Sequence, residues 1–88
     1  MAILTQKLTT TWANEADQYN PDLRTARTIE INSLIEQGKT DGAFVIISPT
    51  ITSRNFSNTS SAQEFADWII NECTLLSITT PTYTITTL

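Results

Sequence analysis

Hydrophobic residues recur at helical spacing in the second half of the chain. From residue 61 onward they form a single apolar face, made up of Ala62, Phe65, Ala66, Ile69, Cys73 and Leu76. A period near 3.6 residues predicts an amphipathic helix. Ser61 with Glu64 fits a capping box at its start, and Ser60 with Gln63 fits an alternative box one residue earlier. This is the most clearly marked helix in the sequence.

A second apolar face at helical spacing follows the dipeptide Asn20-Pro21. Its members are Leu23, Ala26, Ile31, Leu34 and Ile35. Asn can cap a helix and Pro suits its first turn, while Gly38 stands where a left-handed C-terminal cap is expected. The pattern therefore predicts a helix that starts at Pro21 and reaches Gln37. The polar segment 13–20 before it is expected to be a loop.

Strand patterns occupy much of the remaining sequence. Residues 3–12 alternate imperfectly between apolar and polar side chains, which predicts a first strand. The run Ala-Phe-Val-Ile-Ile at 43–47 is short and entirely apolar, so it is expected to be a strand buried on both faces. Residues 50–56 alternate again. Because Pro49 cannot donate to a ladder, it must lie at an edge, a bend or a hairpin tip, and 43–56 is either one bent strand or two.

The C-terminal segments 75–80 and 82–88, separated by Pro81, predict a closing strand with a bend. The elements then follow the order β-α-β(β)-α-β. The sequence therefore predicts a single α+β domain over residues 1–88, with a three- to four-stranded sheet and two helices packed on one face. Its four-stranded version is the split βαβ, ferredoxin-like arrangement. The abundance of Thr agrees with half-buried strand surfaces.

Charge and hydrophobicity exclude several classes of function. The formal net charge is -4 and the five basic residues are scattered along the chain, so no basic stripe for nucleic-acid phosphates is expected. No stretch is long and apolar enough to span a membrane, and the N-terminus lacks the pattern of a secretory signal. We therefore expect no nucleic-acid partner, no membrane association and no secretion.

Residues that could carry catalysis or bind a metal are few. The chain has no His and a single Cys, Cys73, which removes the commonest metal ligand, the usual base for a nucleophile and any intramolecular disulfide. Cys73 lies on an apolar helix face, where it is expected to pack as a small hydrophobe. Glu64 and Asp67 are three residues apart on one helix, but capping and the helix dipole explain both.

The tripeptide Gly38-Lys39-Thr40 matches the end of the phosphate-binding motif GxxxxGK[ST]. Position 33 is Ser rather than the first Gly of that motif, and the tripeptide follows a predicted helix instead of a strand. A helix C-cap and a turn explain it better. We therefore predict a protein that is not an enzyme and has no catalytic residue, metal site, cofactor or small-molecule substrate.

Binding to other proteins is the class of function that these observations leave open. Four residues are candidates for such contacts. Trp is favoured at binding hot spots, which singles out Trp12 and Trp68. The predicted final strand presents Tyr83 and Ile85. Trp12 and Trp68 could instead be core residues, and the pattern leaves both interpretations open. The final strand also exposes unpaired backbone groups, which suits edge-to-edge pairing with another chain.

The segment from Thr52 to Ile70 contains Ser-Arg-x-Phe and then Ser-Ala-x-x-Phe-Ala-x-Trp-Ile. In this segment the chain resembles small, mostly uncharacterised proteins encoded among the structural genes of tailed bacteriophages. The shared pattern is a strand ending near Arg-x-Phe, a cap rich in Ser and Ala, and a helix that bears aromatic residues. The resemblance transfers no site residue. It implies a small particle component held by oligomeric contacts.

Two functions are expected from these observations. The first is a non-enzymatic structural or interaction protein of a tailed-phage virion, such as a capsid, neck or tail accessory protein, found in the virion or the bacterial host cytoplasm. It would associate with itself or with a larger assembly through strand edges and aromatic contacts. The alternative is an acidic regulatory or inhibitory module that binds a host or phage protein.

Overall fold

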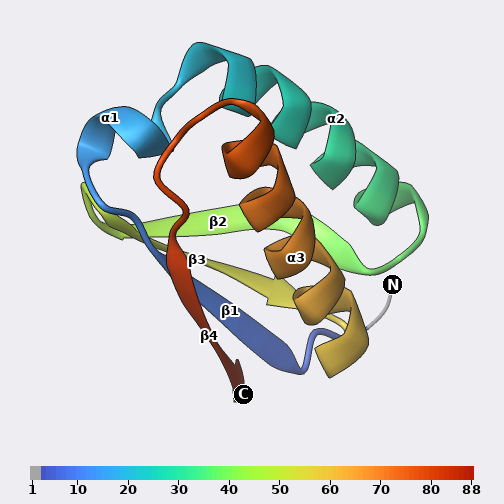
Figure 1. Ribbon diagram of the computed structural model, residues 1–88. Helices are drawn as coiled ribbons and strands as arrows, with labels where there is room; N and C mark the ends of the chain where they lie inside the picture. The colour runs from blue at the N-terminus through green and yellow to red at the C-terminus, as the bar shows by residue number, and fades with distance from the viewer. Residues whose placement is uncertain (1–2) are drawn as a thin grey trace.

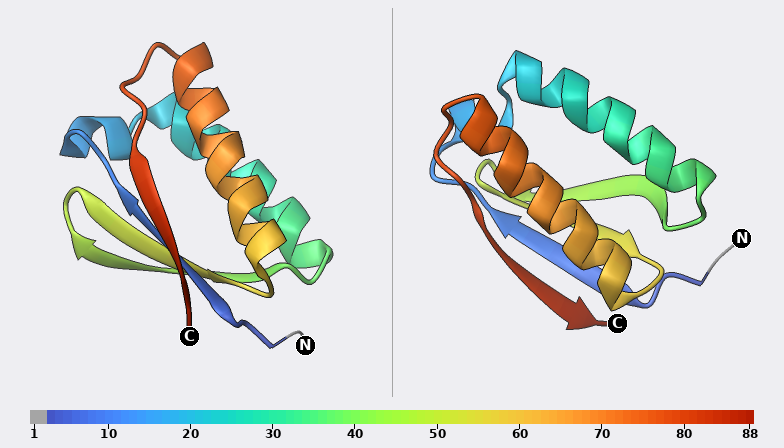
Figure 2. Two further views of the ribbon diagram at one scale, coloured as in Figure 1. Left: turned by 60° about the horizontal axis from the view of Figure 1, so that its bottom comes forward. Right: turned by 45° about the vertical axis from the view of Figure 1, so that its right-hand side comes forward.

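A four-stranded antiparallel sheet carries the two long helices of the protein on one of its faces (Figure 1). The structure, a computed structural model, describes residues 3–88. Its strands are β1 (Gln6–Thr11), β2 (Thr40–Ser48), β3 (Ile51–Phe56) and β4 (Thr82–Thr87), and its helices are α1 (Glu15–Gln18), α2 (Pro21–Glu36) and α3 (Thr59–Leu75). Figure 2 shows from two further sides that α2 and α3 lie on the same side of the sheet.

The strand order in the sheet is β2-β3-β1-β4, and each neighbouring pair is antiparallel. Since β1 and β2 both run antiparallel to β3, they are parallel to each other, and α2 lies in the connection between them. In the same way α3 lies in the connection between β3 and β4, which flank β1. The α+β class is therefore confirmed, in its four-stranded version with two interleaved βαβ units.

One hydrophobic core fills the space between the helices and the sheet. Its buried members come from β1 and the residue after it, from β3, and from α2 and α3. They are Leu8, Trp12, Leu23, Ile31, Leu34, Phe56, Ala62, Phe65, Ala66, Ile69 and Cys73. Phe56 is completely buried, and its ring lies 5.6 Å from that of Phe65 on α3. Five of the six predicted apolar positions of α3 are buried, which confirms its predicted face.

The observed ends of α2 also agree with those predicted from the sequence. The side chain of Asn20 accepts hydrogen bonds from the backbone amides of Asp22 and Leu23, and Pro21 is the first helical residue. Gly38 follows the helix with a φ of 73°, the left-handed conformation that favours Gly. Ile35 differs from the prediction, because its side chain is 41% exposed.

The predicted capping boxes of α3 are wrong. The helix begins at Thr59, and the side chain of Asn58 accepts from the amide of Ser61 at 2.8 Å. Asn is as good an N-cap as Ser, so the run of five polar residues at 57–61 offered several possible helix starts of similar quality. Glu64 does not reach back to the cap but pairs with Lys39, whose Nζ lies 2.9 Å from its Oε2.

The polar segment expected to be a loop contains the short helix α1. Asn14 caps it by accepting from the amide of Asp17 at 2.9 Å. Four residues are too few to show helical periodicity, so the pattern of apolar positions gave no signal. The structure thus has a third helix where two were predicted.

Residues 43–56 form two strands joined at Pro49 and Thr50, so Pro49 takes the hairpin tip among its predicted alternatives. The prediction that 43–47 is buried on both faces is wrong. β2 is an edge strand, and Phe44, Val45, Ile46 and Ile47 are between 51% and 60% exposed. An apolar run indicates a strand, but it does not specify which neighbours the strand has in the sheet.

The terminal strands are shorter than predicted. β1 covers 6–11 within the predicted 3–12. The segment 75–80 is not a strand, because Leu75 ends α3 and Leu76 caps it. The final strand is limited to 82–87.

Candidate functional site

The most exposed apolar segment in the sheet is the run Phe44–Ile47 of β2, here called the apolar edge. Among residues 3–88, β2 pairs only with β3, so its other side presents backbone groups that have no partner strand in that range. Natural edge strands are normally protected by charged residues, Pro or bulges. The ladder between β2 and β3 is irregular before Phe44 and after Ile46, but no charged residue or Pro lies within 43–48.

Side chains of the apolar edge point to both faces of the sheet. Phe44 is paired with Arg54 of β3, and the Arg54 guanidinium carbon lies 4.7 Å above the centre of its ring. The same guanidinium lies 5.7 Å from the ring centre of Phe65 on α3, so Phe44 faces the helices. Val45, the next residue, therefore faces the open side of the sheet.

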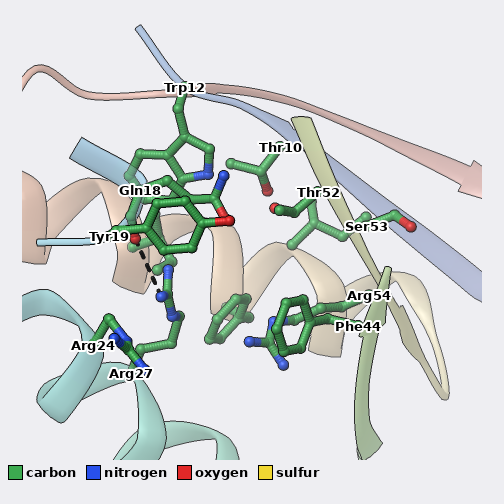
Figure 3. Close-up of a pocket in the computed structure, with 13 residues that line it drawn as sticks. Thr10, Trp12, Gln18, Tyr19, Arg24, Arg27, Phe44, Thr52, Ser53 and Arg54 are labelled. Carbon is green, nitrogen blue, oxygen red and sulfur yellow. Dashed lines mark hydrogen bonds between the residues drawn. The ribbon is translucent and has the colours of Figure 1, made fainter. Parts of the chain in front are cut away.

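A pocket of about 160 Å³ lies between the end of α1, the start of α2 and the strands β1 to β3 (Figure 3). We call it the arginine pocket, because Arg24, Arg27 and Arg54 all line it. Trp12, Tyr19 and Phe44 contribute aromatic walls, and Phe65 and Ile69 contribute apolar surface from α3. Three of the five basic residues of an acidic chain thus share one pocket.

Within the described residues, the three arginines of the pocket lack carboxylate partners. The ion pair of residues 3–88 is that between Lys39 and Glu64, which involves none of them. Arg27 donates to the carbonyl oxygen of Gln18 at 3.3 Å, and Arg54 donates to that of Gly42 at 3.4 Å. Each guanidinium has five N–H donors, so most of their donor capacity is not used by these contacts.

Burial sets the electrostatics of the pocket. It lowers the pKa of Arg54 to about 10, with a smaller contribution from the positive charge of Arg27. Burial also lowers the pKa of Arg27, assisted by Arg24. With a pKa of about 10, Arg54 remains protonated at neutral pH. The pocket therefore holds positive charges that repel one another and are partly removed from water.

A further polar group in the pocket is unsatisfied. Trp12 is only 4% exposed, and its indole Nε1 is buried without a hydrogen-bond partner among residues 3–88. Figure 3 shows its ring entering the pocket above Gln18 and Tyr19. The side-chain Nε2 of Gln18 donates to the carbonyl oxygen of Pro49. Asp17 Oδ2 is also buried without a partner in that range, but Asp17 is not among the residues that line the pocket.

The four interface candidates lie in or against the core rather than on one exposed surface. Trp12 is buried, while Trp68, Tyr83 and Ile85 are partly buried and pack against the core. The Trp68 ring stacks on Phe65 with the ring centres 5.8 Å apart. The hydroxyl of Tyr83 accepts from Gln63 Nε2 at 2.6 Å.

The other residues that could have had a catalytic or binding role lie in the core, on a helix surface or in a turn. Cys73 is a free, fully buried thiol in the core, as its place on the apolar face predicts, and burial raises its pKa. Asp67 accepts from Gln63 at 2.9 Å. Gly38 and Lys39 form the turn from α2 into β2, the reverse of the strand-to-helix context of a phosphate-binding loop.

Across residues 3–88, no three or more His, Cys, Asp or Glu side chains are grouped so that they could hold a metal ion. None of the helices in that range combines the length and the apolar character needed to cross a bilayer.

Comparison with known proteins found no matching family model, no similar curated protein and no similar solved structure.

Sequence reasoning missed the arginine pocket, although a signal for it exists. In the alternation of 50–56, Arg54 shares a face with Thr52 and the buried Phe56. A cation on the core side of a strand needs a partner, and none is evident nearby in the sequence. Arg24 and Arg27 are three apart on α2, which places them on one side of that helix.

Proposed function

We propose that this protein is a non-enzymatic interaction protein that self-associates by pairing β2 of one copy with β2 of a second copy. The observation that carries the proposal is the apolar edge, four consecutive apolar side chains on an edge strand whose outer side has no partner strand. Pairing would satisfy the free backbone groups of β2 and would remove apolar side chains from water at the same time.

A second copy is the occupant that suits this edge best. Two identical strands can pair antiparallel about a twofold axis, so that the same surface is used on both sides. Such pairing brings segment 43–48 against itself, and this segment contains no charge that would be placed opposite a like charge. The net charge of -4 is carried by residues outside it.

The other edge of the sheet is less suited to apolar contacts. β4 presents mainly Thr, and its two large apolar residues, Tyr83 and Ile85, pack toward the core. Edge pairing was expected from this final strand, but the exposed apolar surface is on β2. The proposal therefore keeps the mode of association and assigns it to the opposite edge.

We also propose that the assembly belongs to a tailed-phage particle. The support for this part is the resemblance of Thr52–Ile70 to small phage proteins, together with a small fold suited to oligomeric contacts. In the structure this segment runs from β3, next to the apolar edge, into α3. The proposed role requires protein contacts alone.

The test is the solution mass of the protein, measured by light scattering across a concentration series. We expect a dimer that dissociates on dilution. Val45→Lys places a charge on the open side of the apolar edge and next to its own copy in the dimer, so it should weaken association at least tenfold. Thr84→Lys adds the same charge to the exposed surface of β4 and should leave the mass unchanged.

Far-UV circular dichroism will show whether both variants keep the fold, as exposed positions should. A wild-type protein that remains monomeric at every concentration would overturn the proposed self-association. Equal association of Val45→Lys and wild type would show that β2 is not the contact. A monomer that binds one other protein in a fixed ratio would favour the alternative, a regulatory module.

A further inference from the structure

We propose that the arginine pocket is a binding site for a small planar organic carboxylate of about the size of benzoate. This inference is independent of the self-association through β2. It rests on the unpaired arginines, on the size and walls of the pocket, and on the unpartnered indole of Trp12.

The charges of the pocket call for an anion. The chain has nine acidic residues, yet none of them lines the pocket. Arg24 and Arg27 come from α2 and Arg54 comes from β3, and all three line the same pocket (Figure 3). Arg27 and Arg54 are largely buried without a carboxylate partner. Burying such cations is costly, and a carboxylate ligand would offset that cost by accepting bidentate hydrogen bonds from a guanidinium.

The size and walls of the pocket select a flat, partly apolar molecule. A cavity of about 150 Å³ in another protein binds benzene, and the arginine pocket has nearly the same volume, about 160 Å³. Tyr19 and Ile69 offer apolar surface for a ring, while the guanidinium groups offer donors for its charged group. A bare inorganic anion would use the donors and leave the apolar walls unused.

Trp12 adds a specific donor. An indole N–H can only donate, and a buried donor without an acceptor is unfavourable. Residues 3–88 supply no acceptor for it, even though the indole is almost completely buried. A ligand oxygen in the pocket would satisfy this group. Trp12 would then have a role beyond filling the core.

The experiment is titration calorimetry of the full chain at constant ionic strength with sodium benzoate. Benzamide, which has the same shape without the charge, serves as the neutral control, and inorganic phosphate serves as the control for a simple anion. We expect benzoate to bind at one site with a dissociation constant in the micromolar to millimolar range, and we expect benzamide and phosphate to bind at least tenfold more weakly.

Matched variants locate the binding. Arg24→Met and Arg27→Met each remove one charge from the pocket and should weaken benzoate binding at least tenfold, whereas Lys7→Met removes a charge outside it and should have no effect. Arg24 is exposed, so its variant remains informative if substitution of Arg27 impairs folding. Val45→Lys should bind benzoate normally, because Val45 does not line the pocket.

Three results would overturn the proposal. They are the absence of benzoate binding, phosphate binding as tight as benzoate binding, and equal losses in Lys7→Met and Arg24→Met. The last result would show attraction by overall charge rather than binding in the pocket.

Discussion

Some residues in this protein have packing partners that the sequence does not reveal. Arg54 is held between the rings of Phe44 and Phe65, at 4.7 Å and 5.7 Å from their centres, in place of a carboxylate. Contacts of this kind contribute about 0.5 to 2 kcal/mol each, depending on solvation. They partly offset the cost of burying the charge and fix the guanidinium where the arginine pocket opens.

Two glycines illustrate how surroundings change the effect of the same substitution. Gly38 has a φ of 73°, and a Cβ added there would have no atom within 4 Å, so Gly38→Ala should cost about 1 to 2 kcal/mol from backbone strain alone. Gly42 has a φ of 80°, and a Cβ there would lie 2.5 Å from Cδ1 of Ile35. Gly42→Ala should therefore cost about 1 kcal/mol more, because Ile35 must leave its rotamer.

Urea denaturation of the two variants measures this difference. Equal losses of unfolding free energy would show that Ile35 moves aside without cost. A negligible loss in Gly38→Ala would contradict the left-handed conformation assigned to that position.

At the scale of elements, hydrophobic periodicity predicted the two long helices well and the strand environment poorly. The spacing of apolar residues alone predicted the buried face of α3, because in an amphipathic helix the apolar positions mark the side that packs against the core. β2 has no such pattern, and whether it is central or at an edge depends on the order of strands joined by long connections. The arginine pocket depends on the same long-range arrangement, since it combines residues from α2 and β3.

The start of α3 gives a prediction at the same scale. Asn58 supplies the capping oxygen, whereas Ser60 is exposed within the first turn. Asn58→Ala should therefore destabilise the protein by about 1 kcal/mol, and Ser60→Ala should have little effect. Thermal or urea unfolding distinguishes these outcomes. A larger loss in Ser60→Ala would restore the capping box formed by Ser60 and Gln63 in place of the observed cap.

At the scale of the whole molecule, the fold is complete in one copy. The radius of gyration is 12.1 Å, close to about 12 Å for a compact chain of this length. Association is thus not needed to build the core, and a dissociated monomer should stay folded. Because β2 and β4 form dissimilar edges, the proposed pairing of β2 with itself would use up the apolar edge and would close the assembly at two copies.

The most direct test of this account is amide hydrogen exchange at two protein concentrations, one at which the monomer predominates and one at which the dimer does. We expect the amides of β2 that do not bond to β3 to become protected at the higher concentration, while those of β4 exchange equally in both. Protection that rises on β4 instead, or on neither edge, would contradict the central claim that copies of this protein meet through β2.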